Sequence, residues 1–298
     1  MSVLRTASVV TILLSYTLLL MPIQTLAVRR NWRLAARIPC HWQRVAKRLI
    51  GLRVTIEGTP AKPPLLITAN HISWLDITVL GSVLPLSFIS KAEVQTWPIL
   101  GTLARLQRTV FIDRTRRSQT ASAASAIARR VGGGDVMVLF PEGTTGDGNR
   151  ILPFRSALIG AAGVASGMET ITVQPVAVTY VGMQGIPVGR ADRPSIAWYG
   201  DMDFIAHFRN LVEHGAVDAV VSFGEPITFD QTTDRKKVAE ECYQAVRRMD
   251  EEAKRGASRG GNRGRLFSPK QKPAKEATHT PAPGYPGGRR EEIANRAS

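Results

Sequence analysis

A histidine and a carboxylate lie close together in the stretch LLITANHISWLD, residues 65 to 76. The stretch begins as an apolar, strand-like run, breaks at Asn70, and then presents His71, with Asp76 five positions later. A histidine just past a strand end, with a carboxylate at the start of the next element, is a common way to hold a general base and the group that orients it. By itself a histidine at a strand end is more often a structural residue, so the pair needs support from elsewhere in the chain.

The stretch VMVLFPEGTTGDGNR, residues 136 to 150, gives that support. It runs an apolar strand into a turn that contains Glu142, Gly143 and Thr144. Such a turn exposes backbone N–H groups and hydroxyls that can hold an oxyanion or a phosphate, and Glu142 can hydrogen-bond a substrate hydroxyl. The alternative is a surface turn in which Glu142 is solvated. A calcium loop and a Walker phosphate loop are excluded, because their spacings are missing.

Strand and helix patterns alternate through the middle of the chain and place both stretches at strand ends. Short apolar runs predict strands at 52–58, 65–69, 87–90, 108–113, 135–140, 171–180, 195–199 and 217–223. Helical patterns predict helices from residue 72, from Lys91, and at 118–131, 202–213 and 234–255. Alternating strands and helices predict an α/β fold whose sheet is covered by helices on both faces.

Residues 1 to 30 have the composition of a transmembrane anchor. No charged residue occurs from Ala7 to Val28, and about 20 apolar residues are enough to cross the hydrocarbon core of a bilayer. Arginines follow at once, so the positive-inside rule predicts a single-pass anchor with the rest of the chain in the cytoplasm. The alternative is a cleaved signal peptide with Ala27 before the cut.

Two flanking segments differ in composition from the middle of the chain. Residues 31 to 50 place Trp42 and Leu49 on one helical face and basic residues elsewhere, if Pro39 marks only a break or a first turn. This pattern is typical of a basic amphipathic helix on anionic lipid, and equally of a helix that packs on its own domain. Residues 256 to 298 are rich in Gly, Pro, Arg and Lys and predict a disordered basic tail.

The overall charge predicts an anionic partner. The net charge is +15 and the pI is about 10.6, which suits a nucleic acid, a phosphorylated substrate or an anionic membrane face. The two cysteines, Cys40 and Cys242, are far apart and lack metal-ligand neighbours, so neither a disulfide nor a metal site is predicted. Residues 51 to 255 remain as the folded domain.

Four motifs occur in order along the chain: NHISWLD at 70–76, VFIDR at 110–114, FPEG at 140–143 and QPVAV at 174–178. After a membrane anchor, they resemble the signature of the membrane glycerolipid acyltransferases, whose best-known members are the 1-acylglycerol-3-phosphate acyltransferases. The similarity runs from about residue 50 to 225. It implies a central mixed sheet flanked by helices and the transfer of a fatty acyl group to a lysolipid hydroxyl. The expected acceptor is 1-acylglycerol-3-phosphate, which would give phosphatidate.

The resemblance implies a role for each matching residue. His71 would be the general base that takes the proton from the lysolipid hydroxyl, and Asp76 would hold its tautomer and stabilise the imidazolium. The residues expected to bind the acceptor's head group or shape the pocket are Lys91, Arg114, Glu142, Gly143 and Thr144. Arg114 has the alternative of pairing with Asp113.

The resemblance also implies the partners of the enzyme. The acyl donor would be a thioester of acyl carrier protein or coenzyme A, with no metal and no other cofactor. Membrane lipids are expected partners, on the cytoplasmic side of the cell inner membrane, and nucleic acid is not.

Two positions depart from the phosphatidate-forming relatives. Those relatives usually have Arg after FPEGT, where this chain has Thr145, and Gly two residues before VFIDR, where it has Arg108. A lost arginine weakens the prediction of a phosphate head group unless Arg108 or Arg155 replaces it. The FPEGTT-DGN-LPF pattern is similar to that of bacterial lyso-ornithine lipid O-acyltransferases, which are the alternative.

Two other classes of protein share part of these features. A membrane-tethered nucleic-acid-binding protein would have the charge, but the sequence has no nucleic-acid fold signature. A non-catalytic scaffold of the same fold would have the motifs, but it would not need to keep His71 and Asp76 together.

Overall fold

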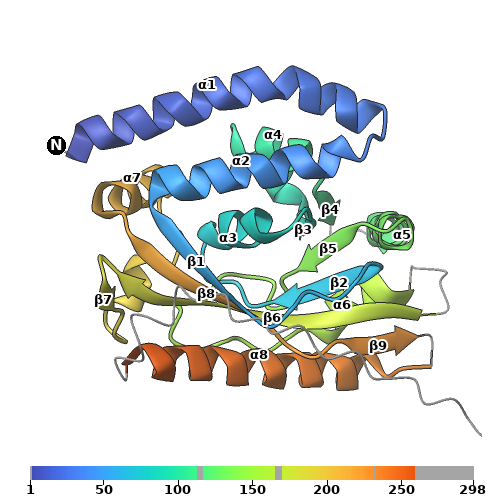
Figure 1. The fold of residues 1–298 in the computed structure, drawn as a ribbon. Helices are drawn as coiled ribbons and strands as arrows, with labels where there is room; N and C mark the ends of the chain where they lie inside the picture. The colour runs from blue at the N-terminus through green and yellow to red at the C-terminus, as the bar shows by residue number, and fades with distance from the viewer. Residues whose placement is uncertain (1, 113–116, 165–169, 231, 259–298) are drawn as a thin grey trace, which may run out of the picture.

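The computed structural model describes residues 2–112, 117–164, 170–230 and 232–258, so Arg114 and residues 259–298 of the predicted tail lie outside the described residues. A mixed sheet of nine strands runs through the described part, with helices on both of its faces (Figure 1). The predicted α/β class with a central mixed sheet is confirmed.

The sheet has the strand order β1-β8-β6-β2-β5-β3-β4, and β7 and β9 pair with β6 outside this path. The strands are Leu52–Glu57 (β1), Leu65–Ala69 (β2), Ser87–Lys91 (β3), Val110–Ile112 (β4), Val136–Leu139 (β5), Thr170–Met183 (β6), Ile186–Pro187 (β7), Val217–Phe223 (β8) and Ile227–Asp230 (β9). From β6 through β2, β5 and β3 to β4, neighbouring strands are parallel, whereas β8 is antiparallel to β6. Parallel strands bring their carboxyl ends to one edge, where open α/β sheets bind ligands.

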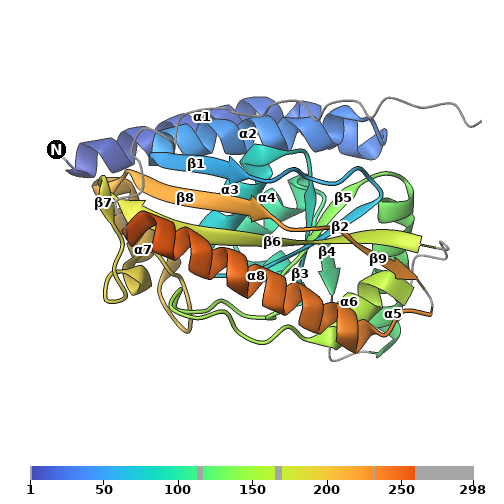
Figure 2. The ribbon, with the colours of Figure 1, turned by 60° about the horizontal axis from the view of Figure 1, so that its bottom comes forward.

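Helices cover both faces of the sheet. They are Ser2–Arg29 (α1), Leu34–Ile50 (α2), Leu75–Val83 (α3), Leu100–Leu106 (α4), Arg117–Gly132 (α5), Ser156–Val164 (α6), Phe204–His214 (α7) and Arg235–Ser258 (α8), with 3-10 turns at Ala92–Thr96 (η1) and Arg193–Ser195 (η2). The α1–α4 helices lie above the sheet in Figure 1, and α8 crosses its other face, in front in Figure 2. Residues of α5, α6 and α8 pack together with the sheet in one hydrophobic core.

The buried strand β2 shows how the sheet packs on both sides. All five of its residues are buried. Leu65 and Ile67 belong to the core formed with α2 and α3, and Leu66 belongs to the core formed with α5, α6 and α8. Side chains alternate along a strand, so a strand covered on both faces needs an unbroken apolar run.

The α1 and α2 helices form an antiparallel hairpin and run side by side in both ribbon views (Figures 1 and 2). Among the described helices, α1 is the one that is long and apolar enough to cross a membrane. Near one end of α1, Arg5 Nη2 donates to Ile50 O at 3.3 Å. Near the other end, Gln24 Nε2 donates to Leu106 O at 2.5 Å. Both ends of α1 therefore contact the globular part.

Pro39 lies inside α2 and does not end it. A proline has no N–H, so the carbonyl four residues earlier, that of Ala35, loses its helical partner. Gln24 of α1 replaces that partner, because its Nε2 donates to Ala35 O at 2.9 Å and the Gln24 side chain is buried. The hairpin thus supplies from α1 the hydrogen bond that α2 lacks.

The secondary structure differs from the sequence predictions in several places. The strand predicted at 195–199 is wrong, because η2 ends at Ser195 and an irregular segment follows. In that segment Trp198 N–H donates to Ile72 O at 3.0 Å, so the backbone pairs with the loop after β2. Lys91 ends β3 and is also the N-cap of η1, so the helical stretch predicted from Lys91 begins one residue later, as a 3-10 turn, and continues as α4. The α6 helix was missed because small and apolar residues give SALIGAAGV no clear helical face.

Candidate active site

The two stretches that the sequence singled out meet at the carboxyl ends of β2 and β5, which are neighbouring parallel strands. His71 lies two residues beyond β2, and Glu142 lies three residues beyond β5. The backbone N–H of His71 donates to Glu142 Oε1 at 2.7 Å, so the two stretches are in direct contact.

Asn70 fixes the point at which the chain leaves the sheet. The ladder between β2 and β6 ends where Ala69 pairs with Val176. The Asn70 side chain, which is fully buried, then donates to Val178 O at 2.9 Å and accepts from Val178 N at 2.8 Å. The amide therefore replaces the backbone pairing that a turn would remove, and His71 follows it at a defined place.

His71 and Asp76 form a hydrogen-bonded pair. His71 Nδ1 and Asp76 Oδ2 are 2.8 Å apart; the Asp76 side chain is fully buried, and 20% of the His71 side chain is exposed. The His71 ring stacks on Phe140 with ring centroids 4.0 Å apart. A carboxylate facing Nδ1 selects the tautomer in which Nδ1 carries the proton and Nε2 is basic. No group in the described part of the chain hydrogen-bonds Nε2, so this nitrogen is open to a substrate hydroxyl.

Asp76 is held by three further donors. Its Oδ2 accepts the N–H groups of Ile72 at 2.7 Å and Ser73 at 3.0 Å, and its Oδ1 accepts the Tyr180 hydroxyl at 2.7 Å. A buried carboxylate needs such partners to offset the loss of water. Burial, and next the negative charge of Asp76, raise the pKa of Tyr180 well above its usual value, so the phenol stays protonated and donates.

Glu142 is buried, which excludes the alternative of a solvated surface turn. Its two carboxylate oxygens accept backbone N–H groups, Oε1 from His71 and Oε2 from Leu152 at 2.9 Å. Burial raises the pKa of Glu142 to about 8, although both backbone hydrogen bonds lower it. Glu142 therefore fastens the segment that carries His71 to the loop that ends near Leu152.

Gly143 and Thr144 follow at the tip of the turn. Gly143 has φ 72, in the left-handed region that glycine adopts readily, and its N–H donates to Phe140 O at 3.1 Å. Thr144 is exposed. Gly146 N–H then donates to His71 O at 2.9 Å, so the loop turns back onto the histidine.

This arrangement is suited to proton transfer from a hydroxyl. An oriented imidazole with an open nitrogen beside a buried carboxylate has the geometry that general bases have. Ser73 Oγ is buried and has no partner in the described structure, so His71 has no serine hydroxyl of this segment to activate. Among the described residues, no group of His, Cys, Asp and Glu side chains is placed to hold a metal ion.

Comparisons with known proteins identify the chemistry. The family model described as Acyltransferase matches residues 51–179. The chain is 42% identical to the lyso-ornithine lipid O-acyltransferase of Rhizobium meliloti (strain 1021) over 257 residues, which cover 85% of this chain and 88% of that protein. This chain belongs to the glycerolipid acyltransferase family.

Other relatives agree with this assignment. The acyltransferase is 43% identical to the lyso-ornithine lipid O-acyltransferase of Brucella abortus (strain 2308), over 81% of this chain and 92% of that protein. It is 36% identical to the 1-acyl-sn-glycerol-3-phosphate acyltransferase of Neisseria gonorrhoeae, over 51% of this chain and 56% of that protein. The crystal structure of the 1-acyl-sn-glycerophosphate acyltransferase PlsC from Thermotoga maritima has the same fold, with a TM-score of 0.54 at 20% identity, covering 84% of this chain and 98% of that one. The family and the enzyme class predicted from the four motifs are confirmed.

The two cations expected to hold the acceptor are only partly described. Lys91 is the exposed last residue of β3, at the same edge of the sheet as His71, and its Cα pairs with that of Ile112 in β4. Arg114 and Asp113 lie outside the described residues. The head-group roles of Lys91 and Arg114 in this acyltransferase stay predictions.

Arg108 lies at the opposite edge of the sheet. It precedes β4, and its guanidinium binds both oxygens of Asp135, which precedes β5. Arg130 donates to the same carboxylate at 2.8 Å. Residues that precede parallel strands lie at the amino edge of the sheet, so the hypothesis that Arg108 replaces the missing arginine is wrong. Arg155 is exposed and its N–H donates to Pro141 O, so its backbone lies beside the Glu142 turn.

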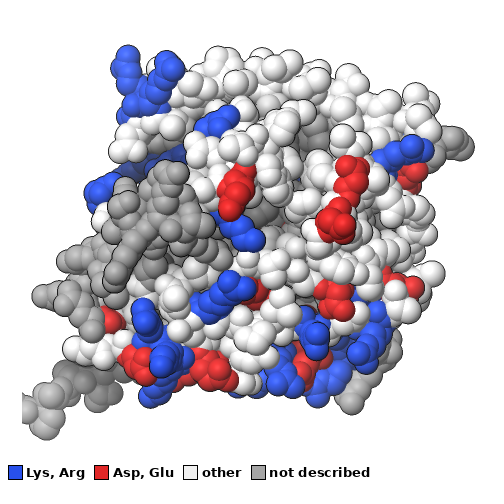
Figure 3. Space-filling model, turned by 180° about the vertical axis from the view of Figure 1, so that it is seen from behind, with Lys and Arg blue, Asp and Glu red and all other residues white. Residues whose placement is uncertain are grey.

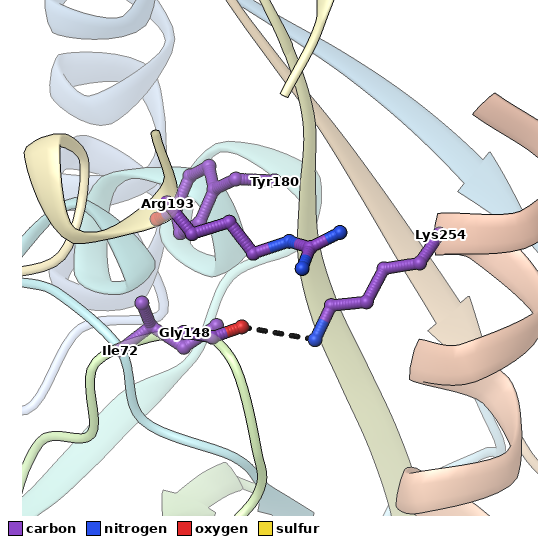
Figure 4. Close-up of a pocket in the computed structure, with 5 residues that line it drawn as sticks. All are labelled: Ile72, Gly148, Tyr180, Arg193 and Lys254. Atoms are coloured by element: carbon purple, nitrogen blue, oxygen red, sulfur yellow. Dashed lines mark hydrogen bonds between the residues drawn. The ribbon is translucent and has the colours of Figure 1, made fainter. Parts of the chain in front are cut away.

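The last described helix, α8, contacts the loop that follows Glu142. A small cavity of about 10 Å³, room for about one water molecule, is lined by Ile72, Gly148, Tyr180, Arg193 and Lys254 (Figure 4). Lys254 Nζ donates to Gly148 O at 2.9 Å and to Asp250 Oδ2 at 2.6 Å. The acyltransferase thereby links the loop after Glu142 to the helix that covers the far face of the sheet.

Sequence reasoning missed Tyr180 as a partner of the His71–Asp76 pair. A signal for it exists, because Val176, Val178 and Tyr180 alternate along β6 and all three belong to the core on the α3 side. The alternation predicts that the Tyr180 side chain lies on the α3 side of the sheet. Only the position of β6 beside β2 brings its hydroxyl to Asp76.

Proposed function

We propose that this acyltransferase moves a fatty acyl group from a thioester to the free hydroxyl of a lyso-ornithine lipid. The observation that carries the proposal is the extent of similarity. Relatives named lyso-ornithine lipid O-acyltransferase match 85% and 81% of the chain, whereas the Neisseria relative named for 1-acylglycerol-3-phosphate matches 51%. Thr145, in place of the arginine usual in phosphatidate-forming relatives, supports the same acceptor, since Arg108 binds Asp135 at the other edge.

The second candidate acceptor is 1-acylglycerol-3-phosphate, which would give phosphatidate. It is favoured by the motif VFIDR, which places Arg114 after β4, and by Lys91 at the end of β3. Lys91 is the last residue of β3, and Arg114 comes two residues after the end of β4 in the sequence. The carboxyl ends of both strands lie on the His71 edge, where two cations would suit a phosphate.

In the proposed reaction, His71 Nε2 accepts the proton of the acceptor hydroxyl as that oxygen attacks the thioester carbonyl carbon. A tetrahedral intermediate forms, and its collapse breaks the carbon–sulfur bond and forms the ester. The leaving thiolate takes the proton back from the His71 imidazolium. Asp76, which hydrogen-bonds Nδ1, stabilises that imidazolium. General-base assistance of this kind is worth about 10²–10⁴ in rate.

Other residues position the reactants in this proposal. Glu142 holds His71 and the following loop, and Gly143 and Thr144 shape the turn above the imidazole. Lys91 and Arg114 bind the acceptor's anionic group. The donor is a thioester of acyl carrier protein or coenzyme A, and no metal takes part.

We also propose that the amino-terminal helices attach the enzyme to the cytoplasmic face of the inner membrane. The top of the molecule in Figure 3, where α1 lies in Figure 1, shows few charged side chains. Lys and Arg side chains gather at one end of this edge. At 28 residues and about 1.5 Å per residue, α1 is about 42 Å long, enough to cross a bilayer as a single-pass anchor. The hydrogen bonds of Arg5 and Gln24 to the globular part support a helix that lies along the domain instead, since a spanning helix has to break one of them.

The test of function is an acyl-transfer assay on membranes from cells that express the wild type or His71→Ala. Lyso-ornithine lipid and lysophosphatidate are offered separately with a labelled acyl thioester, first of acyl carrier protein and then of coenzyme A. We expect transfer to lyso-ornithine lipid and its loss in His71→Ala. Transfer only to lysophosphatidate would establish the second candidate. Activity that survives in His71→Ala would overturn the mechanism, and wild type inactive toward both would favour the scaffold.

The test of attachment uses two variants of the same enzyme. Removal of residues 1 to 50 should release the domain from membranes, and full retention would contradict the anchor. In the full chain, Val3→Cys is treated with a maleimide that does not cross membranes. Labelling of intact spheroplasts would show a single-pass helix, whereas labelling only after lysis would show that α1 stays on the cytoplasmic side.

A further inference from the structure

An open cleft is formed by residues at the junction of the hairpin with the sheet. This junction, where α2 leads into β1, lies at the end of the molecule opposite the α1–α2 turn (Figure 1). Its volume is about 420 Å³, and it is lined by Arg5, Arg48, Gly51, Leu52, Arg53 and Ala216. These residues come from four places in the sequence: the start of α1, the end of α2, the start of β1 and the turn before β8. The fold therefore collects three arginines that no single sequence segment contains.

Two of these three arginines have no carboxylate partner in the described structure. Arg53 is paired, because its Nε and Nη2 donate to the two oxygens of Asp218 at 2.5 and 2.9 Å. Arg5 has a carbonyl partner, Ile50 O, at 3.3 Å. Arg48 is exposed and takes part in none of the ion pairs found among the described residues. The cleft thus holds about two positive charges that nothing described neutralises.

Neighbouring groups are consistent with a positive potential at this place. Burial lowers the pKa of Lys47, and the adjacent charges of Arg48 and Arg44 lower it further. Positive charges that lie close together repel one another, and a bound anion relieves this repulsion. A cluster of unpaired cations is therefore typical of an anion-binding surface.

The backbone leaves room for the Arg5 guanidinium. Gly51 ends α2 with φ 92, and a Cβ atom there would be 3.2 Å from Arg5 Nη2 and 2.9 Å from Ala216 N. Gly215 has φ 60, and a Cβ atom on it would overlap the Arg5 guanidinium. The absence of a Cβ atom at Gly51 and Gly215 therefore leaves the space that the Arg5 guanidinium occupies.

The cleft opens beside apolar side chains. Val3 and Leu4, which flank Arg5 in sequence, are 64% and 74% exposed. Exposed aliphatic side chains next to unpaired arginines match a molecule with a negative head group and hydrocarbon chains, and do not match a free ion.

We propose that this arginine cleft binds the phosphate head group of an anionic membrane lipid, with the lipid's acyl chains along the exposed face of α1. The lipid is distinct from the substrate, because the cleft lies beside β1, and two strands, β8 and β6, separate β1 from the strand β2 that leads to His71. None of the residues that line the cleft hydrogen-bonds His71 or Asp76. Binding there also holds the start of α1 against Ile50 and Gly51. The inference rests on the proposed attachment of α1 to a membrane.

The test measures binding of the purified full-length enzyme to vesicles by flotation. One set is phosphatidylcholine alone, and the other has part of it replaced by phosphatidylglycerol. The variants are Arg48→Gln and the double variant Arg5→Gln/Arg48→Gln. The control, Arg247→Gln/Arg255→Gln, removes the same charge from exposed positions of α8 on the far face of the sheet.

We expect phosphatidylglycerol to strengthen binding of the wild type and the control equally. Loss of one arginine near an anionic surface should weaken this extra binding about fivefold, and loss of both roughly 30-fold. Arg48→Gln keeps the hydrogen bond of Arg5, so it reports on the cleft even where the double variant loosens α1. Binding to phosphatidylcholine alone should be the same in all four proteins, which separates the cleft from the general attachment.

Two results would overturn the proposal. One is an equal loss of phosphatidylglycerol dependence in the cleft variants and the α8 control, which would show a nonspecific effect of net charge. The other is wild-type binding that does not change when phosphatidylglycerol is added to the vesicles but is lost when inorganic phosphate is added. That result would make the ligand of the cleft a free ion.

Discussion

The Tyr180 hydroxyl donates to Asp76 Oδ1 at 2.7 Å, on the side of the carboxylate that His71 does not use. Both side chains are buried. The carboxylate is thus held between the imidazole on one oxygen and the phenol on the other. The orientation of the Asp76 carboxylate toward His71 therefore depends on Tyr180 in β6 as well as on the backbone of the His-x-x-x-x-Asp segment.

Tyr180→Phe should lower kcat about tenfold with little change in KM, since it leaves a buried carboxylate oxygen without its donor and loosens the orientation of His71. The measurement is steady-state acyl transfer with saturating donor. Tyr199→Phe is the matched control, because the Tyr199 side chain is half-buried and its hydroxyl has no hydrogen bond in the described structure. An unchanged kcat in Tyr180→Phe would show that the three donors on Oδ2 orient Asp76 by themselves.

Asp76→Asn should lower kcat by about 10²–10⁴, because the amide keeps the size of the side chain but not the negative charge that stabilises the imidazolium. The variant should still fold, since Oδ can accept from Ile72 and Ser73 while the amide faces Tyr180, whose hydroxyl can accept. The assay is run beside circular dichroism of the same preparation. A loss smaller than twofold in a folded variant would argue against a catalytic pair.

Glu142 gives the enzyme a predictable pH dependence of stability. Its pKa is about 8 in the folded chain, against 4.5 for the free side chain, so the folded state binds the extra proton. The free energy of unfolding should therefore fall as the pH rises from 4.5 to about 8, by at most about 1.4 kcal/mol per pH unit. Urea unfolding at several pH values in detergent measures it.

The control for this prediction is a pair of variants. Glu142→Gln imitates the protonated acid and should remove most of that slope, whereas Glu225→Gln, at an exposed position, should leave it. A wild-type curve with no slope in this interval would mean that the two backbone hydrogen bonds, and not burial, control the charge of Glu142.

Asn70→Ala should destabilise the fold by about 2 to 4 kcal/mol, because it leaves both backbone groups of Val178 buried without a partner. Chemical denaturation gives the value. Asn210→Ala, on the exposed face of α7, should change stability by less than about 0.5 kcal/mol. Equal stability of the two variants would show that water replaces the Asn70 amide.

Local sequence patterns predicted the parts of the site that depend on neighbours in the chain. The apolar run before Asn70 gave β2, the run before Phe140 gave β5, and the spacing of His71 and Asp76 gave the pair. These features follow from periodicity and turn chemistry over a few residues, which is why they can be read without a structure. The wrong strand at 195–199 has the same origin, since Ile196 and Ala197 are buried by tertiary packing without pairing in the sheet.

What the sequence determined by itself is therefore the class of fold, the acyltransferase motifs, the closeness of His71 to Asp76 and the apolar amino-terminal segment. Only the tertiary structure decided the rest: that Tyr180 reaches Asp76, that Glu142 is buried against His71, and that Arg108 lies at the wrong edge to bind substrate. The reason is physical. A periodic pattern records which face of an element is buried, but strand order decides which distant residues meet, and that order follows from how the whole core packs.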